Sequence, residues 1–280
     1  MTLDILICTI DEGIERVPEV LMSPRGDVRY VVSMQYSCPC AGRKSHAEER
    51  GKELETELLK RVPQVLRERE DVVLTFLEGR GLSRNRNHAL EMATGDILLI
   101  ADDDNRYTKE LIDRIFEAYR EHEKADIICF AAESYGGEPM KTYPTETMPY
   151  RRAMEQGYYP TSMEMTMRKG VEVRFDERFG LGSELLCAGE EDVFLKDAQD
   201  KGYQVLFVPK VIVRSRYETT GSHFIGNKKL QMSKGATFKY VYGTPNALWR
   251  TLKEAGWWLV HRKVNPVPIL WNMLKGMVEV

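Results

Sequence analysis

Short runs of β-branched and other apolar residues recur through the first half of the chain, and each has the length of a strand. Stretches with helical periodicity separate most of them. Such alternation of strands and helices is typical of an α/β fold, with a mostly parallel sheet that helices cover on both faces. The strands are expected at residues 3–9, 28–34, 71–77, 96–101 and 125–131.

The helical stretches carry start and stop signals. Ser83 is expected to cap one helix and Gly95 to end it, while Thr108 is expected to cap the next one. Pro63 is expected to kink or divide the longest stretch, because proline lacks a backbone N–H and clashes with the preceding turn. The helices are expected at residues 46–70, 83–95 and 108–124.

The second half of the chain is less regular. Residues 133–160 are rich in Gly, Pro, Thr and Tyr, which predicts a long loop or a β-ribbon. A strand is expected at 163–168, and a helix that ends near Gly202 is followed by another strand. The remainder is basic and helical. We therefore expect one domain at 1–225 and a helical C-terminal extension at 226–280.

The composition is that of a soluble globular protein, with 42% hydrophobic and 30% charged residues. A net charge of −3 gives no electrostatic basis for binding nucleic acid. The low count of five cysteines favours a reducing compartment over a disulfide framework, and Cys38 and Cys40 are interpreted as ordinary loop thiols. The first residues are typical of a strand rather than of a signal peptide.

No apolar run reaches the roughly 20 residues that a membrane-spanning helix needs. The C-terminal stretch 256–280 is nevertheless aromatic, contains methionine and carries Lys and Arg. It has two interpretations: a segment that lies on a membrane surface, or a terminal helix packed on the body or on a partner subunit. The expected location is the cytoplasm, at the inner face of the membrane if the first interpretation holds.

Three consecutive aspartates follow the apolar run at 96–101. Side chains two residues apart on an extended backbone point the same way, so Asp102 and Asp104 are expected to converge while Asp103 faces elsewhere. Two carboxylates suit Mg²⁺ or Mn²⁺, which complete their coordination with the oxygens of a substrate diphosphate. The alternative is a strand-end turn whose Asp and Asn side chains cap the next helix.

A second acidic cluster, Glu190, Glu191 and Asp192, follows a glycine-containing loop at a helix start. Acidic residues there stabilise the helix through its dipole, and this is the commoner reason for such a cluster. The functional alternative is a general base held near a reacting hydroxyl group. The cluster alone does not decide between these two interpretations.

Four segments, in this order along the chain, resemble the family 2 glycosyltransferases of GT-A fold. They are "DILICTID", "GRGLSRNRNHALEMATGDILLIADDDN", "RFDERFGLGSELLCAGEEDVFL" and "KGYQVLFVP". The resemblance extends from the N-terminus to about residue 225. It implies a Rossmann-like, mostly parallel sheet flanked by helices. It also implies an enzyme that moves a sugar from a nucleotide-diphosphate sugar to an acceptor, with inversion and with Mg²⁺ or Mn²⁺.

The resemblance also implies roles for individual residues. Asp192 would be the catalytic base, with Glu191 beside it. Asp103 would contact the donor. The remaining candidates are Asp102, Asp104 and His223 as metal ligands, and Thr9, Asp11, Arg86 and Asp102 as residues that bind the nucleotide sugar.

The second strand departs from the family pattern. Family members usually carry an Asp pair there followed by Gly-Ser, whereas this chain reads "SMQYS" and places Gln35 at that position. A Gln amide both donates and accepts hydrogen bonds, so it can read a base edge. The identity of the base stays open, and UDP is expected only because the family commonly uses it.

The sequence therefore predicts an inverting, metal-dependent glycosyltransferase. Its acceptor would be the hydroxyl group of a saccharide or of a lipid-linked glycan, in polysaccharide or glycoconjugate synthesis. Two alternatives are a non-catalytic nucleotide- or carbohydrate-binding module of the same fold, and a nucleotidyltransferase. The first rests on Gln35 alone, and the second lacks the Gly-rich basic loop expected after the first strand.

Overall fold

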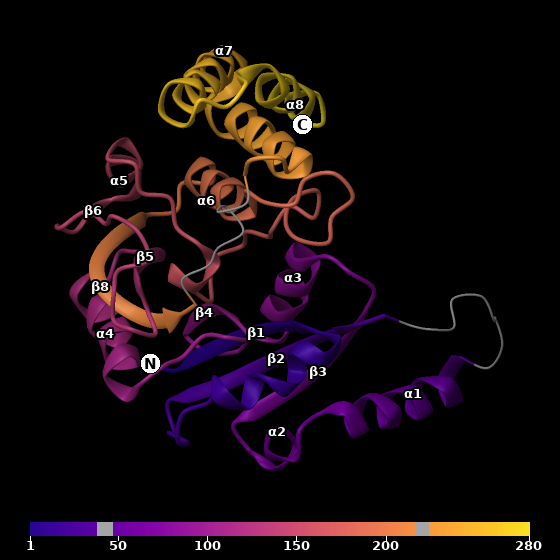
Figure 1. The fold of residues 1–280 in the computed structure, drawn as a ribbon. Helices are drawn as coiled ribbons and strands as arrows, with labels where there is room; N and C mark the ends of the chain where they lie inside the picture. Colours follow the sequence, from indigo (N-terminus) through magenta and orange to yellow (C-terminus); the bar gives the residue numbers. More distant parts are fainter. Residues whose placement is uncertain (38–46, 217–223) are drawn as a thin grey trace. The chain divides into compact units, whose positions relative to one another are not determined.

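The computed structural model describes residues 1–37, 47–216 and 224–280. Within these residues eight strands form one sheet in the order β3-β2-β1-β4-β7-β5-β8-β6 (Figure 1). The α/β prediction is confirmed, and every predicted strand is present. The strands are β1 Leu3–Ile10, β2 Val28–Tyr36, β3 Val72–Glu78, β4 Ile97–Asp102, β5 Ile127–Ser134, β6 Met148–Pro149, β7 Met165–Arg168 and β8 Val205–Ser215.

The sheet is mostly parallel, as predicted. β1 pairs in parallel with β2 and with β4, β2 with β3, and β5 with β8. The short strands β6 and β7 pair antiparallel with their neighbours. The carboxyl ends of β1, β2 and β4 therefore meet at one edge, which is where ligands bind in open α/β sheets.

Helices cover both faces of this sheet. On one face α4 (Lys109–Glu121) buries Ile112, Ile115 and Phe116 in the core cluster that includes Leu3 and Ile5 of β1. On the other face α3 (Leu82–Met92) is held by hydrogen bonds. Asn85 Oδ1 accepts from Ser33 of β2 at 2.6 Å, and the His88 ring contacts the Thr75 hydroxyl of β3 at 2.7 Å.

Most of the predicted helix boundaries hold. Pro63 divides the long stretch into α1 (Ala47–Arg61) and α2 (Gln64–Glu68). Thr108 caps α4, where its hydroxyl oxygen accepts from Leu111 N. The predicted irregular stretch 133–160 contains β6 and one short helix, α5 (Tyr150–Glu155).

The predicted ends of α3 are wrong. The helix starts before Ser83, whose hydroxyl donates instead to the Phe179 carbonyl at 2.6 Å. Gly95 lies beyond the last helical residue, Met92. Its N–H donates to the buried Asp4 carboxylate at 2.9 Å, and a Cβ at Gly95 would lie 2.8 Å from Asp4 N. This glycine permits a close backbone approach rather than a helix stop.

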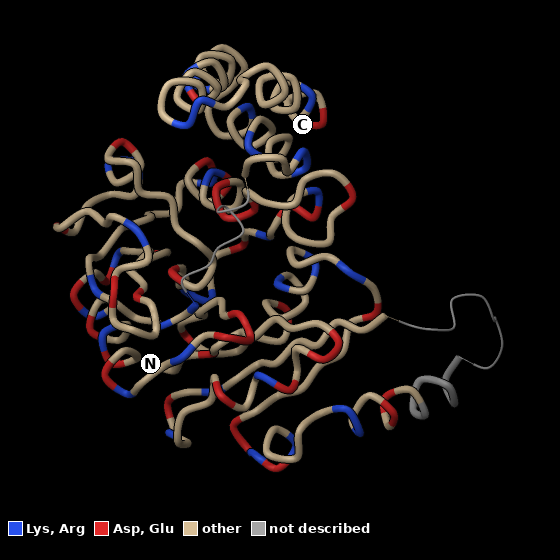
Figure 2. The backbone as a smooth tube through the Cα atoms, viewed as in Figure 1, with Lys and Arg blue, Asp and Glu red and all other residues tan. Residues whose placement is uncertain are grey.

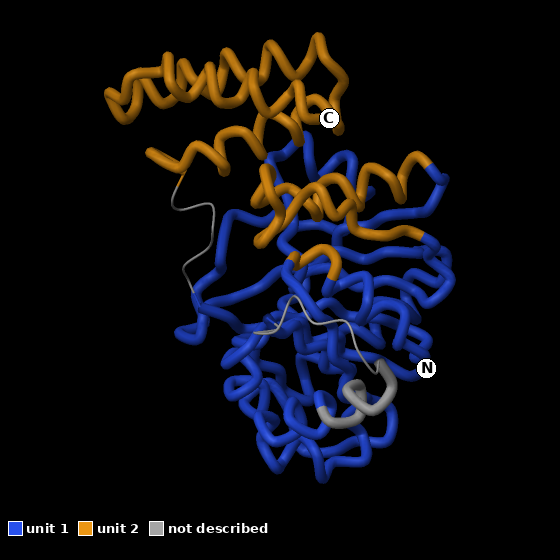
Figure 3. Tube along the Cα trace, turned by 90° about the vertical axis from the view of Figure 1, so that its right-hand side faces the viewer, with its two compact units in different colours: residues 1–80, 85–172, 201–217 blue, residues 81–84, 173–200, 218–280 orange. Residues whose placement is uncertain are grey.

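The chain forms two compact units (Figure 3). The first consists of residues 1–80, 85–172 and 201–217 and contains the whole sheet. The second consists of residues 81–84, 173–200 and 218–280.

The second unit contains α6 (Glu190–Asp200), α7 (Lys228–Arg262) and α8 (Pro266–Val278). The helix that was predicted to end near Gly202 and the helical C-terminus are both confirmed. α7 is kinked at Gly243, which has a positive φ of 73°. Gly235 of α7 and Gly276 of α8 let these helices touch, since an added Cβ would lie within 2.0 Å of the Met273 or Met232 carbonyl oxygen. No helix in the described ranges is both long and apolar enough to cross a membrane.

The pair Arg69–Asp71, just before β3, should make stability depend on pH. Its two hydrogen bonds, at 2.8 and 2.5 Å, hold the pKa of the Asp71 carboxyl below its ordinary value. Because the pKa is lower in the folded protein, the ionised carboxylate stabilises the fold at pH values above its unfolded-state pKa of about 4. This stabilisation disappears as the pH falls through the folded-state pKa. Asp71→Asn should therefore lower the melting temperature at neutral pH and lower it less near pH 3. Thermal unfolding at both pH values measures this, and an equal loss at both would contradict it.

Candidate active site

The three aspartates lie at a strand end that turns at once. β4 ends at Asp102, and Asp103 and Asp104 form a turn. Because Asp104 lies in a turn, the alternation of side-chain directions along a strand does not determine where its side chain points. Asn105 is fully buried and fixes this turn: its Oδ1 accepts from Asp102 N at 2.8 Å, and its Nδ2 donates to Ser215 Oγ at 3.2 Å. It does not cap α4, because Thr108 does.

Asp103 is held by β1 and by the segment that follows it. Thr9 Oγ1 donates to Asp103 Oδ2 at 2.6 Å, and Arg16 reaches both carboxylate oxygens at 2.8 Å. The hydrogen bond from Arg16 to Asp103 raises the pKa of the guanidinium. Gly13 makes room for this arrangement, because a Cβ there would lie 2.3 Å from Thr9 Oγ1 and 2.4 Å from Asp103 Oδ2. Asp103 therefore joins the aspartate turn to the end of β1.

Asp102 and Asp104 are the more accessible members of the turn, with side chains 40% and 27% exposed. Each lies near an arginine: Arg86 NH2 is 3.5 Å from Asp102, and Arg216 Nε is 3.7 Å from Asp104. Two partly exposed carboxylates fit Mg²⁺ or Mn²⁺, which need few protein ligands when a diphosphate supplies others. Among the described residues no cluster of three or more potential metal ligands occurs.

Arg86 lies on α3 with its side chain 2% exposed. Its NH2 group donates to Ser162 Oγ at 2.6 Å, which fixes the guanidinium beside Asp102. Burial raises the pKa of the nearby Cys8 thiol to about 12, so this cysteine stays protonated and unreactive at neutral pH.

The ends of β1 and β2 supply Asp11 and Gln35. Asp11 has a positive φ of 46°, unusual for a residue with a side chain, and accepts from Ser37 N at 3.2 Å. Gln35 is only 2% exposed, and its Nε2 has no hydrogen-bond partner among the described residues. A buried donor without a partner is costly, so such a group is a candidate ligand contact.

Glu191 and Asp192 lie in the second unit, in the first turn of α6, and both are half-buried. The helix start predicted at this acidic cluster is confirmed. Gly189, just before it, has a φ of 95°, and a Cβ there would lie 2.0 Å from Thr237 Oγ1 of α7. This close contact fixes where α6 begins.

Three residues singled out from the sequence lie outside the described residues: His223, Cys38 and Cys40. The role of His223 as a metal ligand stays a prediction.

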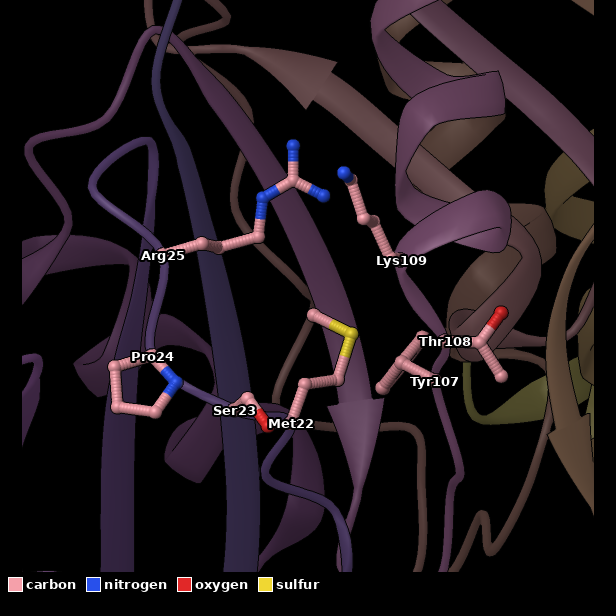
Figure 4. A pocket seen from close by; sticks show the side chains of 7 residues that line it. All are labelled: Met22, Ser23, Pro24, Arg25, Tyr107, Thr108 and Lys109. Carbon is pink, nitrogen blue, oxygen red and sulfur yellow. The ribbon is translucent and has the colours of Figure 1, made fainter.

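A pocket of about 640 Å³ lies elsewhere in the first unit (Figure 4). Its lining consists of the segments 22–25 and 107–109. None of the predicted site residues lines it. We therefore do not assign the donor to this pocket.

Sequence reasoning missed several residues that shape the aspartate turn. Arg16 and Arg216 were not distinguishable from the many other arginines of the chain. Asn105 carried a signal, since it ends the "DDDN" motif, but that signal also suited a helix cap. Tyr135 donates from its hydroxyl to the Asp104 carbonyl. Only the pairing of distant strands brings these side chains together.

The fold resembles that of TarS from S. aureus. The crystal structure of TarS 1-349 aligns with a TM-score of 0.56 at 13% identity and covers 100% of this chain and 92% of that chain. The complex of TarS 1-349 with UDP-GlcNAc aligns with a TM-score of 0.52 at 14% identity, covering 94% and 74%.

A longer TarS chain also aligns, with a TM-score of 0.52 at 14% identity, and the alignment covers 94% of this chain but only 44% of that one. This chain thus spans less than half the length of the longer TarS chain. At such identities the likeness establishes the fold alone.

The similarity to a sequence family comes from a separate comparison. No curated protein matches the sequence. Residues 56–180 match the sequence model of the family described as Glycosyl transferase family 2. The matched range contains Arg86 and the aspartate turn, but neither the ends of β1 and β2 nor Glu191 and Asp192. Residues 56–180 are therefore similar to glycosyl transferase family 2, and the chain that contains them has the GT-A fold.

Proposed function

We propose that the protein is a glycosyltransferase that takes a sugar from a nucleotide-diphosphate sugar and transfers it, with inversion, to an acceptor hydroxyl group. The observation that carries this proposal is the aspartate turn. It presents two accessible carboxylates, Asp102 and Asp104, at the carboxyl edge of the sheet, inside the family-matched segment. Buried Asn105 holds the backbone of the turn, and buried Thr9 holds the Asp103 carboxylate between the other two aspartates.

Asp102 and Asp104 would hold a Mg²⁺ or Mn²⁺ ion. When bound, the ion would stabilise the negative charge that develops on the departing diphosphate. Arg86 and Arg216 lie close to these carboxylates and would add positive charge for the diphosphate. Asp103 would stay engaged with Thr9 and Arg16 and would contact the donor from that position.

The base of the nucleotide would lie at the ends of β1 and β2, against Asp11 and Gln35. The unpartnered Nε2 of Gln35 supports this placement, because a carbonyl oxygen on the base would satisfy it. UDP is our first candidate, since TarS 1-349 was crystallised with UDP and with UDP-GlcNAc. The acceptor would be a saccharide or a lipid-linked glycan.

Replacing Gln35 should separate nucleotide binding from folding. Gln35→Met keeps the approximate volume and removes an amide whose Nε2 has no partner among the described residues, so the melting temperature should change little. Nucleotide affinity should fall by about ten-fold, because the bound base loses a hydrogen bond in a buried place. Isothermal calorimetry with the nucleotide and Mn²⁺ measures the affinity. Unchanged affinity in a folded Gln35→Met variant would remove Gln35 from the base site.

In the transfer step, the acceptor oxygen attacks the anomeric carbon from the face opposite the diphosphate. A new C–O bond forms, the bond to the diphosphate breaks, and Asp192 takes the proton of the acceptor hydroxyl. Support for this role comes from the resemblance of the segment "RFDERFGLGSELLCAGEEDVFL", which contains Asp192, and from the half-buried setting of Asp192 at the start of α6. Glu191 would position the acceptor or the helix.

A donor-binding screen tests the proposed function without knowledge of the acceptor. Ligands that bind only the folded protein raise its apparent stability, so the melting temperature should rise with one class of nucleotide sugar plus Mn²⁺. Nucleoside triphosphates should raise it less. If no nucleotide sugar raises the melting temperature while a nucleoside triphosphate does, the result contradicts a glycosyltransferase and favours a nucleotidyltransferase.

The three described cysteines, Cys8, Cys129 and Cys187, are free thiols, which supports a reducing compartment as the place of action. We propose the cytoplasm.

A further inference from the structure

The C-terminal helices expose an unusual amount of large apolar surface. In the part of α7 that follows the kink at Gly243, the exposed fractions reach 61% for Trp249 and 70% for Val260. In α8 they reach 60% for Trp271 and 82% for Val278. Large apolar side chains gathered in this way mark an interaction surface more often than isolated ones do.

The exposed side chains lie in one stripe on each helix. At 100° per residue, the α7 positions fall on one half of the helix, within about 180° of one another, and the α8 positions within about 40°. We call these the α7 stripe and the α8 stripe. The α7 stripe consists of Leu248, Trp249, Leu252, Trp257, Leu259 and Val260, and the α8 stripe consists of Val267, Trp271 and Val278.

Neither stripe serves the packing of the two helices. The inward face of α8 is formed by Ile269, Met273 and Met277, which are nearly fully buried. The inward face of this part of α7 is formed by Ala247 and Ala255, which are also buried. The stripes therefore lie outside the buried contact between the two helices.

Positive charges outnumber negative ones around the stripes. Residues 244–280 contain Arg250, Lys253, Arg262, Lys263 and Lys275, against the carboxylates of Glu254 and Glu279. Glu254 is already engaged, with Lys234 Nζ at 2.7 Å and Trp258 Nε1 at 2.8 Å. Figure 2 shows the result as blue and tan segments with little red along α7 and α8.

Each stripe pairs an exposed tryptophan with a lysine four residues later. Lys253 Nζ lies 5.3 Å from the Trp249 ring centre, and Lys275 Nζ lies 5.4 Å from the Trp271 ring centre. An exposed indole with a cation beside it suits the boundary between lipid headgroups and acyl chains, where tryptophan and lysine are both favoured. The basic residues alone would also suit an acidic protein partner. The tryptophan–lysine pair that occurs on both helices is the feature that favours a membrane surface.

We propose that the α7 and α8 stripes bind the surface of an anionic lipid membrane. The apolar side chains enter the headgroup boundary, and the flanking lysines and arginines contact lipid phosphates. The inference is independent of the proposed catalytic function, since no residue of the stripes belongs to the candidate active site.

Intrinsic fluorescence reports on this surface directly. All four tryptophans of the chain, Trp249, Trp257, Trp258 and Trp271, lie on α7 and α8. Vesicles of equal parts phosphatidylcholine and phosphatidylglycerol should shift the tryptophan emission of the full chain to shorter wavelength and sediment the protein. Vesicles of phosphatidylcholine alone should do so weakly, and added salt should weaken the binding to anionic vesicles.

Two double variants separate the apolar and the electrostatic contributions. Lys253→Gln with Lys275→Gln should weaken binding to anionic vesicles by about five-fold per lysine. Trp249→Ala with Trp271→Ala should weaken it by at least about ten-fold. The matched control is Lys124→Gln with Met92→Ala, which changes an exposed lysine and an exposed apolar residue of the first unit and should bind as the wild type does.

Three results would overturn the proposal. The first is a wild-type protein that neither sediments with anionic vesicles nor changes its emission. The second is equal vesicle binding by the wild type and both double variants, with melting temperatures that show all of them folded. The third is a wild-type dimer in light scattering that the tryptophan variant abolishes, without vesicle binding, because the stripes would then join two copies of this chain.

Discussion

Asp102→Asn is expected to reduce sugar transfer by about a thousand-fold and to remove the Mn²⁺ dependence of nucleotide binding. The neutral amide is a poor ligand for a hard divalent cation, so the ion and the diphosphate it would hold both bind less tightly. Asp104→Asn should have the same effect, because its carboxylate is the other accessible one of the turn. Transfer rates and calorimetric titration of the nucleotide, with and without Mn²⁺, measure both losses.

Folding must be separated from chemistry in these variants. Asp102 lies 3.5 Å from the buried guanidinium of Arg86, so its neutralisation should lower the melting temperature. Asp104 lies near the exposed Arg216, and its replacement should cost little stability. The matched control is Asp96→Asn at the opposite end of β4, which should keep full activity. If both Asp102→Asn and Asp104→Asn retain Mn²⁺-dependent nucleotide binding, the turn is not the donor site.

Asp192→Asn is expected to lower the transfer rate by about 10²- to 10⁴-fold, as is typical when a general base is lost, and to leave donor affinity nearly unchanged. Loss of one charge in the first turn of a helix costs about 1 kcal/mol or less, so unfolding would not explain such a decrease. Glu191→Gln should have the milder effect. Donor binding and transfer rate are measured side by side for the two variants.

Exposed Glu184, a few residues before α6, provides the matched control, and Glu184→Gln should behave as the wild type. Full transfer by Asp192→Asn together with loss in Glu191→Gln would reassign the base to Glu191. Full transfer by both variants would leave the acidic cluster as a helix start and nothing more.

The periodic parts of the fold were predictable because each depends on local signals. Pro63 divides two helices and Thr108 caps α4 with its own hydroxyl group, and neither effect depends on residues distant in the sequence. Ser83 and Gly95 were misread for the opposite reason. Their local signals are those of helix ends, but distant partners, the Phe179 carbonyl and the Asp4 carboxylate, determine what they do.

In the candidate site, too, some features follow from local sequence signals and others depend on distant contacts. The order of the motifs and the acidic residues at strand and helix starts were visible in the sequence. The turn after Asp102 was not, because a chain that leaves a strand can continue extended or turn, and here Asn105 decides through contacts with Ser215 and Met163. The clamp of Asp103 by Thr9 and Arg16 likewise depends on the pairing of β1 with β4, which brings residues more than eighty positions apart together.

The most direct test of the central claim is the phosphorus NMR spectrum of the wild-type protein incubated with nucleotide sugars and Mn²⁺. Even without an acceptor, slow transfer to water should release a nucleoside diphosphate from the preferred donor, and Asp102→Asn should abolish this signal. The contradicting result is an unchanged spectrum for every nucleotide sugar, or release of pyrophosphate from a nucleoside triphosphate in its place.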